Sequence, residues 1–132
     1  PGTYYVQVIK PELRLSKKGD DMLSYELHVV DGGKLCHDNV MLAGGGRSMG
    51  MAKLKALGFT EAIAEIESGD MIGRRAYVAV VEENYVDKNG AAKVRLAVNI
   101  RAGRYCGYWP ENDPPADYIK NSEKPLVDET PF

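Results

Sequence analysis

Basic residues gather around two turns of the sequence, and tyrosines lie close to one of them. The turns are Lys17–Asp20 and Asp87–Gly90. The basic residues at these turns or on the strands beside them are Arg14, Lys17, Lys18, Lys88, Lys93, Arg95 and Arg101, and the candidate rings are Tyr77 and Tyr85. Guanidinium and ammonium groups form charge-assisted hydrogen bonds with phosphates and carboxylates, and phenol rings stack on other flat rings. Together these residue types suit an extended, anionic ligand that carries planar groups.

A glycine run adds a further candidate contact. Gly44-Gly45-Gly46-Arg47-Ser48 opens a segment with helical character, and amides at such a position can approach a phosphate. The run lacks the G-x-x-x-x-G-K-[ST] spacing of a P-loop. The run is therefore not a P-loop. Arg47 is a candidate phosphate contact on a bound strand, and the alternative interpretation of the run is a flexible turn.

The residues that could support catalysis or metal binding are poorly placed for it. Cys36, His37 and Asp38 are consecutive, but neighbouring side chains of a strand point to opposite faces, so a thiol–imidazole pair is not expected. The two histidines and two cysteines lack the spacing of zinc ligands. We predict that the protein is not an enzyme and has no cofactor and no metal site.

The composition is that of one folded domain. The chain has 132 residues, of which 44% are hydrophobic, with a formal net charge of −2. Residues 1–101 hold 14 Lys and Arg against 13 Asp and Glu, whereas residues 102–132 hold 3 against 6, so the acidic excess lies at the end. A nearly neutral body can still carry a basic stripe.

The distribution of cysteines and apolar residues indicates a cellular compartment. Cys36 and Cys106 are far apart and show no C-x-x-C spacing, which suits a reducing cytoplasm. No window approaches the roughly 18 apolar residues that span a bilayer, and the opening residues lack the basic and apolar regions of a secretory signal. We expect a cytoplasmic protein with no membrane partner.

Hydrophobic alternation predicts five strands. The clearest alternation places Leu23, Tyr25 and Leu27 on one apolar face. In the last strand, Val94, Leu96, Val98 and Ile100 share one face, and the other face carries Lys93, Arg95 and Arg101. The predicted strands are Tyr4–Ile9 resuming at Leu13–Leu15 after Pro11, Met22–Val30, Lys34–Leu42, Arg74–Glu83 and Ala92–Arg101.

Two helices are predicted between the third and fourth strands. Ser48 is the expected cap of the first, which runs to about Leu57 and ends at Gly58. The second covers Glu61–Glu67 and ends at Gly69. Five strands with a helical connection between strands 3 and 4 is the order of the OB fold, a small Greek-key barrel. The rival architecture is a five-stranded α+β sheet with its helices on one face.

The predicted OB barrel would place the basic residues where they can act together. The loops after strands 1 and 4, with the neighbouring sheet face, are where OB folds hold oligonucleotides. Such sites combine a cationic groove with rings that stack on bases. In the alternative interpretation, the exposed cations of the strand face serve only to keep that face solvated. The ligand of the module then stays undefined.

The end of the sequence, PLVDETPF, resembles the acidic tip of bacterial single-stranded DNA-binding proteins, whose pattern is D-D-D-I-P-F. Asp128, Glu129, Pro131 and Phe132 match this pattern in kind, while Thr130 stands where isoleucine is usual. The resemblance implies a partner-binding tip in which the aromatic ring fills an apolar pocket and the acids meet basic residues.

The body of the sequence resembles a family of small phage and prophage proteins regarded as single-stranded DNA-binding OB folds. The matching stretches are LSKKGDDMLSYELHVVDGG, MAKLKALGFTEAIAEIESGDMIGRRAYVAV and ENYVDKNGAAKVRLAVNI. The resemblance implies a sequence-tolerant single-strand binder that acts in phage DNA replication, recombination or repair in the bacterial cytoplasm.

From these features we predict an OB-fold DNA-binding domain over residues 1–103 and a flexible acidic tail over residues 104–132. The expected partners are single-stranded DNA and, through the tip, replication or repair proteins of host or phage. A homodimer is compatible with the free edges of an open barrel. The main alternative is an OB-type protein-interaction module without nucleic-acid binding.

Overall fold

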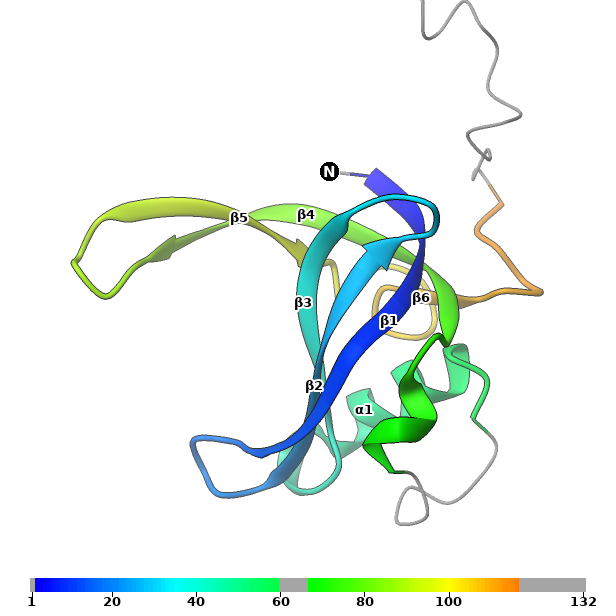
Figure 1. Ribbon diagram of the computed structural model, residues 1–132, viewed down its shortest axis with the longest axis horizontal. Coiled ribbons are helices and arrows are strands. Elements are labelled where there is room, and N and C mark those ends of the chain that lie inside the picture. The colour runs from blue at the N-terminus through cyan, green and yellow to red at the C-terminus, as the bar shows by residue number, and fades with distance from the viewer. Residues whose placement is uncertain (1, 60–66, 117–132) are drawn as a thin grey trace, which may run out of the picture.

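The computed structural model describes residues 2–59 and 67–116. Antiparallel strands make up most of this part of the chain, in the spatial order β3-β2-β1-β4-β5, and the short β6 pairs with β4 (Figure 1). The elements are β1 Gly2–Leu15, β2 Asp21–Val29, β3 Lys34–Met41, η1 Gly44–Gly46, α1 Arg47–Ala56, η3 Ser68–Met71, β4 Arg75–Val86, β5 Ala92–Val98 and β6 Tyr108–Pro110. The predicted mainly β class, with a helix between β3 and β4, is confirmed.

Strand β1 is continuous through Pro11, where the sequence suggested an interruption. Its pairing with β2 shifts register between Ile9 and Glu12, and Lys10 has a φ of 53°. A bulge accommodates a proline because that residue has no N–H to give to the ladder. Residues Gly2–Gln7 of β1 pair with β4, and pairing with β2 begins at Val6, so β1 joins the two parts of the sheet.

The two outer strands, β3 and β5, approach each other without forming a ladder. Some of their Cα atoms lie within 8 Å of one another. Among the described strands, however, β3 pairs only with β2 and β5 pairs only with β4. The observed pairing therefore gives the predicted strands in a curled sheet but does not close a barrel.

Helix α1 begins one residue before the predicted cap. Ser48 lies inside the helix, Gly46 is its N-cap, and no side chain caps this end, so the predicted cap is wrong. The reason is the preceding 3-10 turn, in which the Arg47 N–H already bonds to the Gly44 carbonyl and leads the chain into the helix.

The predicted end of α1 is confirmed. Gly58 has a φ of 92°, and its N–H bonds to the carbonyl of Lys55. The N–H of Phe59 bonds to the carbonyl of Leu54. This is the Schellman arrangement, for which glycine is favoured because it adopts a positive φ without steric cost.

The second predicted helix falls almost entirely on residues 60–66, which lie outside the described residues. The chain is described again from Glu67, which caps η3. The Glu67 side chain accepts from the backbone of Asp70 and the Asp70 side chain accepts from that of Glu67. Gly69, the predicted helix end, lies within η3.

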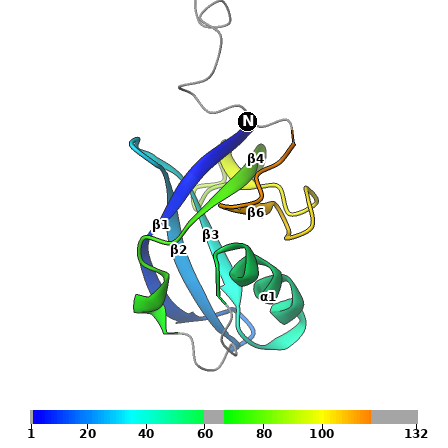
Figure 2. The ribbon, with the colours of Figure 1, turned by 90° about the vertical axis from the view of Figure 1, so that its right-hand side faces the viewer.

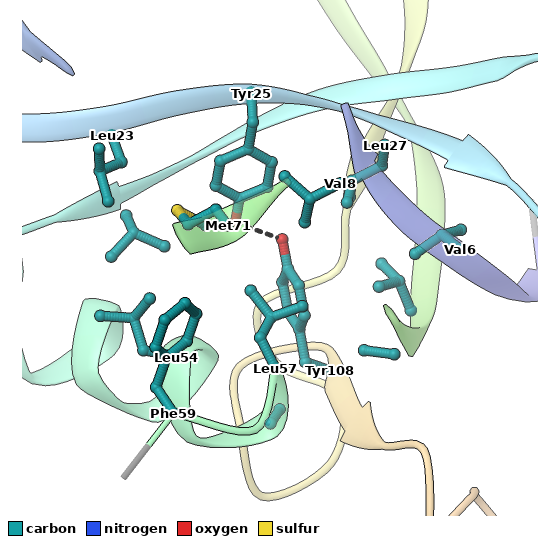
Figure 3. Packing of buried hydrophobic residues seen from close by; sticks show 14 of the residues in the cluster. Val6, Val8, Leu23, Tyr25, Leu27, Leu54, Leu57, Phe59, Met71 and Tyr108 are labelled. Carbon is teal, nitrogen blue, oxygen red and sulfur yellow. Dashed lines mark hydrogen bonds between the residues drawn. The ribbon is translucent and has the colours of Figure 1, made fainter. Parts of the chain in front are cut away.

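The core lies between the curled sheet and α1 (Figure 3). Leu23, Tyr25 and Leu27 of β2 point into it and are at most 2% exposed, as predicted. Leu54 and Leu57, from the helical side, pack against the same cluster. Each buried leucine side chain stabilises the fold by roughly 1.5–3 kcal/mol on full burial, so this layer stabilises the packing of the sheet on α1.

Strand β5 follows its predicted alternation only over its second half. Leu96 and Val98 pack against the core, but Val94 is 58% exposed and Ile100 lies beyond the strand and is 46% exposed. For Val94 the reason is visible in Figure 1, where the β4–β5 hairpin extends away from the body and has no layer opposite its outer half. The β1–β2 hairpin projects on the same side of the molecule.

The segment after Gly103 is more ordered than the sequence suggested. Tyr108 is fully buried, and β6 pairs with β4 through Tyr77 and Trp109. Figure 2 shows β6 beside β4 and above α1. The folded unit therefore continues past the predicted boundary at Gly103 because residues of the expected tail complete the core.

Replacing Gly50 by alanine is expected to lower the free energy of unfolding. A Cβ at this position would lie 2.2 Å from the carbonyl oxygen of Met41 and 3.0 Å from Cγ1 of Val40, so α1 would have to move away from β3. Overpacking of this kind costs about 1–3 kcal/mol, and urea unfolding measures it. Gly45→Ala is the matched control because a Cβ there meets nothing within 4 Å. Equal stability of the two variants would contradict the close approach of α1 to β3.

Candidate nucleic-acid interface

A cleft of about 750 Å³ lies where β3 and β5 face each other. Residues 34–39 of β3 and 95–98 of β5 line it as consecutive runs, and α1 contributes Met49 and Lys53. Because successive side chains of a strand alternate between faces, a consecutive run means that the edge of each strand borders the cleft. Lys34 and His37 are exposed on the β3 side. The volume of the cleft is within the range of small-molecule pockets.

Tyr85, Arg95 and Glu83 form a compact cluster at the β4 and β5 side of the cleft. The Nε and Nη2 atoms of Arg95 donate to Oε1 of Glu83 at 3.0 and 2.7 Å. The Arg95 guanidinium also lies 4.7 Å from the centre of the Tyr85 ring. Glu83 is opposite Arg95, and Tyr85 is opposite Lys93, so all four side chains share one face of the hairpin. The predicted grouping of Lys93 and Arg95 is confirmed.

The β1–β2 hairpin carries a second arginine–glutamate pair. Arg14 donates from Nε and Nη2 to Oε2 of Glu12, at 2.8 and 2.5 Å. Both residues line a hollow of about 180 Å³ that shares Ser24 and His37 with the larger cleft. Of the basic residues predicted on the first hairpin, Arg14 therefore lies next to the cleft, through a hollow that shares these residues with it.

The other predicted contacts occupy different positions. Lys17 and Lys18 are exposed in the β1–β2 turn, and Lys88 is exposed in the β4–β5 turn. Arg47 is the exposed first residue of α1. Arg101 lies in a turn after β5, not on the strand face where it was predicted, because β5 ends at Val98. None of these five residues lines the cleft, so they lie outside its immediate walls.

Tyr77 was predicted to offer an exposed ring, and this is wrong. It is 5% exposed. Its ring centre lies 4.9 Å from that of Tyr5, its partner on β1, and Trp109 of β6 is its partner on the other side. The burial follows from β6, which no sequence pattern predicted. Tyr85 is the candidate ring that remains accessible in part.

A buried polar network lies beside the cleft. Lys53 is 3% exposed, and its Nζ lies 3.0 Å from each carboxylate oxygen of Asp38 and 3.1 Å from the carbonyl of Asn39. The Tyr108 hydroxyl donates to Asp38, and the Tyr25 and Tyr108 hydroxyls are 2.7 Å apart (Figure 3). Burial, reinforced by the Asp38 carboxylate, raises the pKa of both tyrosines well above the ordinary value. Both phenols therefore stay protonated and can donate.

This network was missed in the sequence, although one signal for it exists. Gly50, Lys53, Leu54 and Leu57 recur at the spacing of a buried helix face. A lysine on such a face requires a buried partner, because an unpaired buried charge is very costly. The identity of the partner, Asp38 on β3, is not visible in the sequence.

Cys36 and His37 point in different directions, as expected on a strand. Cys36 is buried in the core and His37 is exposed. Burial, with a smaller effect of the Asp38 carboxylate, raises the pKa of the Cys36 thiol to about 11.

We therefore expect slow alkylation of Cys36 by iodoacetamide at pH 8 in the folded protein and fast alkylation after denaturation, because the thiolate is the reactive form. Peptide mass spectrometry measures the alkylation rate in both states. Cys106, which is less buried, is the internal reference. Equal rates for Cys36 and Cys106 in the folded protein would contradict the burial of Cys36.

The described part of the chain was compared with the requirements of a metal site and of a membrane-spanning helix. Within residues 2–59 and 67–116, no three His, Cys, Asp or Glu side chains come together in a way that could hold a metal ion. No helix among these residues is both long and apolar enough to cross a membrane.

The predicted partner-binding residues Asp128, Glu129, Pro131 and Phe132 lie outside the described residues. Comparison with known proteins adds no assignment: no protein-family model matches the sequence, and no curated protein matches it. The family resemblance and the function that it implies stay predictions.

Proposed function

We propose that this protein is a non-enzymatic, sequence-tolerant single-stranded DNA-binding protein with an OB-type barrel. The strand pairings β1–β2, β2–β3, β1–β4 and β4–β5 are those of an OB barrel, a fold that is itself partly open. The missing pairing is β3–β5, and these are the strands that approach each other across the cleft.

The observation that carries the proposal is the position of the cleft relative to the basic and aromatic side chains. Arg95 and Tyr85 lie at the cleft itself, and Arg14 borders the adjoining hollow. Lys17, Lys18, Lys88 and Lys93 are exposed on the two projecting hairpins. Single-strand binders combine cations that follow the phosphates with a ring that stacks on a base, and both elements are present around one cleft.

The same features favour binding without a sequence preference. Every base has a flat face that can stack on Tyr85, and phosphates carry no sequence information. The proposed setting is DNA replication, recombination or repair of a phage in its bacterial host. The tip residues Asp128, Glu129, Pro131 and Phe132 would recruit partner proteins, and Arg47 and Arg101 would contribute peripheral phosphate contacts.

Tyr85 provides the mutational test of this function. Tyr85→Leu is expected to weaken binding of an oligothymidine by about 1–3 kcal/mol, the contribution of one stacked base. Tyr85→Phe is the matched control, because it keeps the ring and should retain most of the affinity. Fluorescence anisotropy measures both variants, and equal losses for leucine and phenylalanine would contradict a stacking role.

A second candidate function is a protein-interaction module. The observation that favours it is the exposure of Leu13, Leu15, Val86 and Val94 on the two hairpins, at 58–67% of each residue's surface. Exposed apolar groups that cluster on a soluble protein mark interaction sites. Absence of DNA binding together with a stable complex with a purified partner protein would favour this function over the first.

A further inference from the structure

Arg95 is the cation closest to the candidate stacking ring, yet it is already occupied. Its guanidinium donates twice to one oxygen of Glu83 and at the same time covers one face of the Tyr85 ring. In this arrangement two of the guanidinium nitrogens donate to Glu83, and one face of the Tyr85 ring is covered. Arg14 is held by Glu12 in the same way on the other hairpin, without a ring partner.

We infer that Glu83 acts as an internal substitute for phosphate, which holds Arg95 against Tyr85 in the free protein and releases it to the DNA backbone on binding. This inference rests on the proposed function and names the residue that regulates the site. Carboxylate and phosphate both accept the donors of an arginine fork. The phosphate of a bound strand can therefore take the place of the Glu83 carboxylate.

The exchange requires little energy because the pair is open to solvent. The Arg95 and Glu83 side chains are 58% and 47% exposed. Ion pairs this accessible contribute little to stability, since water and salt screen them. A phosphate, which brings further contacts along its strand, can therefore displace Glu83.

Release of Arg95 would open two binding groups together. The guanidinium would turn to a phosphate, and the ring face that it covered would become free for a base. A single glutamate therefore couples the electrostatic contact to the stacking contact. Glu12 would restrain only the electrostatic contact, because Arg14 covers no ring among the described residues.

The decisive variant is Glu83→Gln, compared with Glu82→Gln as a matched control. Glu82 precedes Glu83 on β4 and is also exposed, but its side chain lies on the other face of the hairpin. Its cross-strand partner there is Leu96. It forms no ion pair with any described residue. Both substitutions remove one negative charge from the same strand, so the comparison controls for the change in net charge.

We expect Glu83→Gln to bind oligothymidine about fivefold more tightly at low salt, the size of one unit-charge contact in water. The slope of log affinity against log salt should steepen by up to about 0.7, the value for one additional phosphate contact. Glu82→Gln should change affinity by less than about twofold, because its charge is farther from Arg95 and screened by solvent. Equal responses of the two variants would overturn the inference while leaving the proposed function intact.

A double variant tests the coupling to the ring. In a Tyr85→Leu background, Glu83→Gln should give a clearly smaller gain than in the wild type, because contacts that act together are not additive. An identical gain in both backgrounds would overturn the coupling. Failure of the wild type and all variants to bind single strands, with unchanged circular dichroism, would instead overturn the proposed function and this inference with it.

Discussion

Replacing Asp38 by alanine is expected to lower the free energy of unfolding by about 3–5 kcal/mol, the cost of leaving one partner of a buried ion pair alone. Lys53 is 3% exposed and has Asp38 as its ion-pair partner. The variant also removes the acceptor of the Tyr108 hydroxyl. Of the hydrogen-bond acceptors of the buried ammonium among the described residues, the Asn39 carbonyl would remain and the Asp38 carboxylate would be lost. The folded state would therefore lose the charge that compensates the buried lysine.

Urea or thermal unfolding followed by circular dichroism measures this loss. The control is the double variant Asp38→Leu with Lys53→Met, in which apolar groups replace both charges. Such replacements are often neutral or stabilising, so the double variant should be more stable than Asp38→Ala alone. A loss below about 1 kcal/mol for Asp38→Ala, as for an exposed pair, would contradict the buried network.

Removing the lysines of the β4–β5 hairpin is expected to have the largest effect on binding. For Lys88→Ala with Lys93→Ala, the slope of log affinity against log salt should fall by about 1.4, at about 0.7 for each single-strand phosphate contact. Over the decade between 1 M and 0.1 M salt this corresponds to a loss of roughly 25-fold at the lower concentration. Both side chains are exposed, and neither forms an ion pair with a described residue, so they are available to a ligand.

Lys55 provides the comparison for this prediction. It is an exposed lysine of α1 and lies on neither of the two projecting hairpins. Lys55→Ala should leave the salt slope unchanged. If both sets of variants changed the slope in proportion to the charges removed, binding would depend on net charge and not on a site at the hairpin.

The parts of the fold that the sequence predicts well are those encoded by local patterns. Alternation in β2 places Leu23, Tyr25 and Leu27 in the core, and Gly58 marks the end of α1. Both are decided within a few residues, by the two-residue repeat of a strand and by the positive φ of a helix end. The missed cap at Ser48 is also local, since the 3-10 turn before α1 replaced it.

The parts that were missed depend on contacts between distant segments. β6 has three residues and includes Pro110, so no alternating pattern in the sequence predicts this strand. Its presence buries Tyr77, whereas Tyr85, on the same face of β4, lies in the projecting half of the hairpin and stays partly accessible. Two tyrosines with equivalent positions in the strand repeat therefore differ in exposure because of a segment about thirty residues further along the chain.

In the candidate site, too, the features set by local patterns were predicted and those set by contacts between distant segments were missed. The basic residues of the two hairpins were identified because turns and alternating strands can be recognised locally. The pairing of Arg95 with Glu83 depends on the register between β4 and β5, and the cleft depends on the approach of β3 to β5. Neither the register nor the approach of these strands follows from residue spacing alone.

The most direct test of the central claim is fluorescence anisotropy of a labelled single-stranded oligonucleotide, with its duplex as comparison, at two salt concentrations. We predict tight binding of the single strand, weaker binding of the duplex, and an affinity for the single strand that falls as salt is raised. Absence of single-strand binding at low salt, or an affinity that does not change with salt, would contradict a cationic single-strand groove and favour the protein-interaction module.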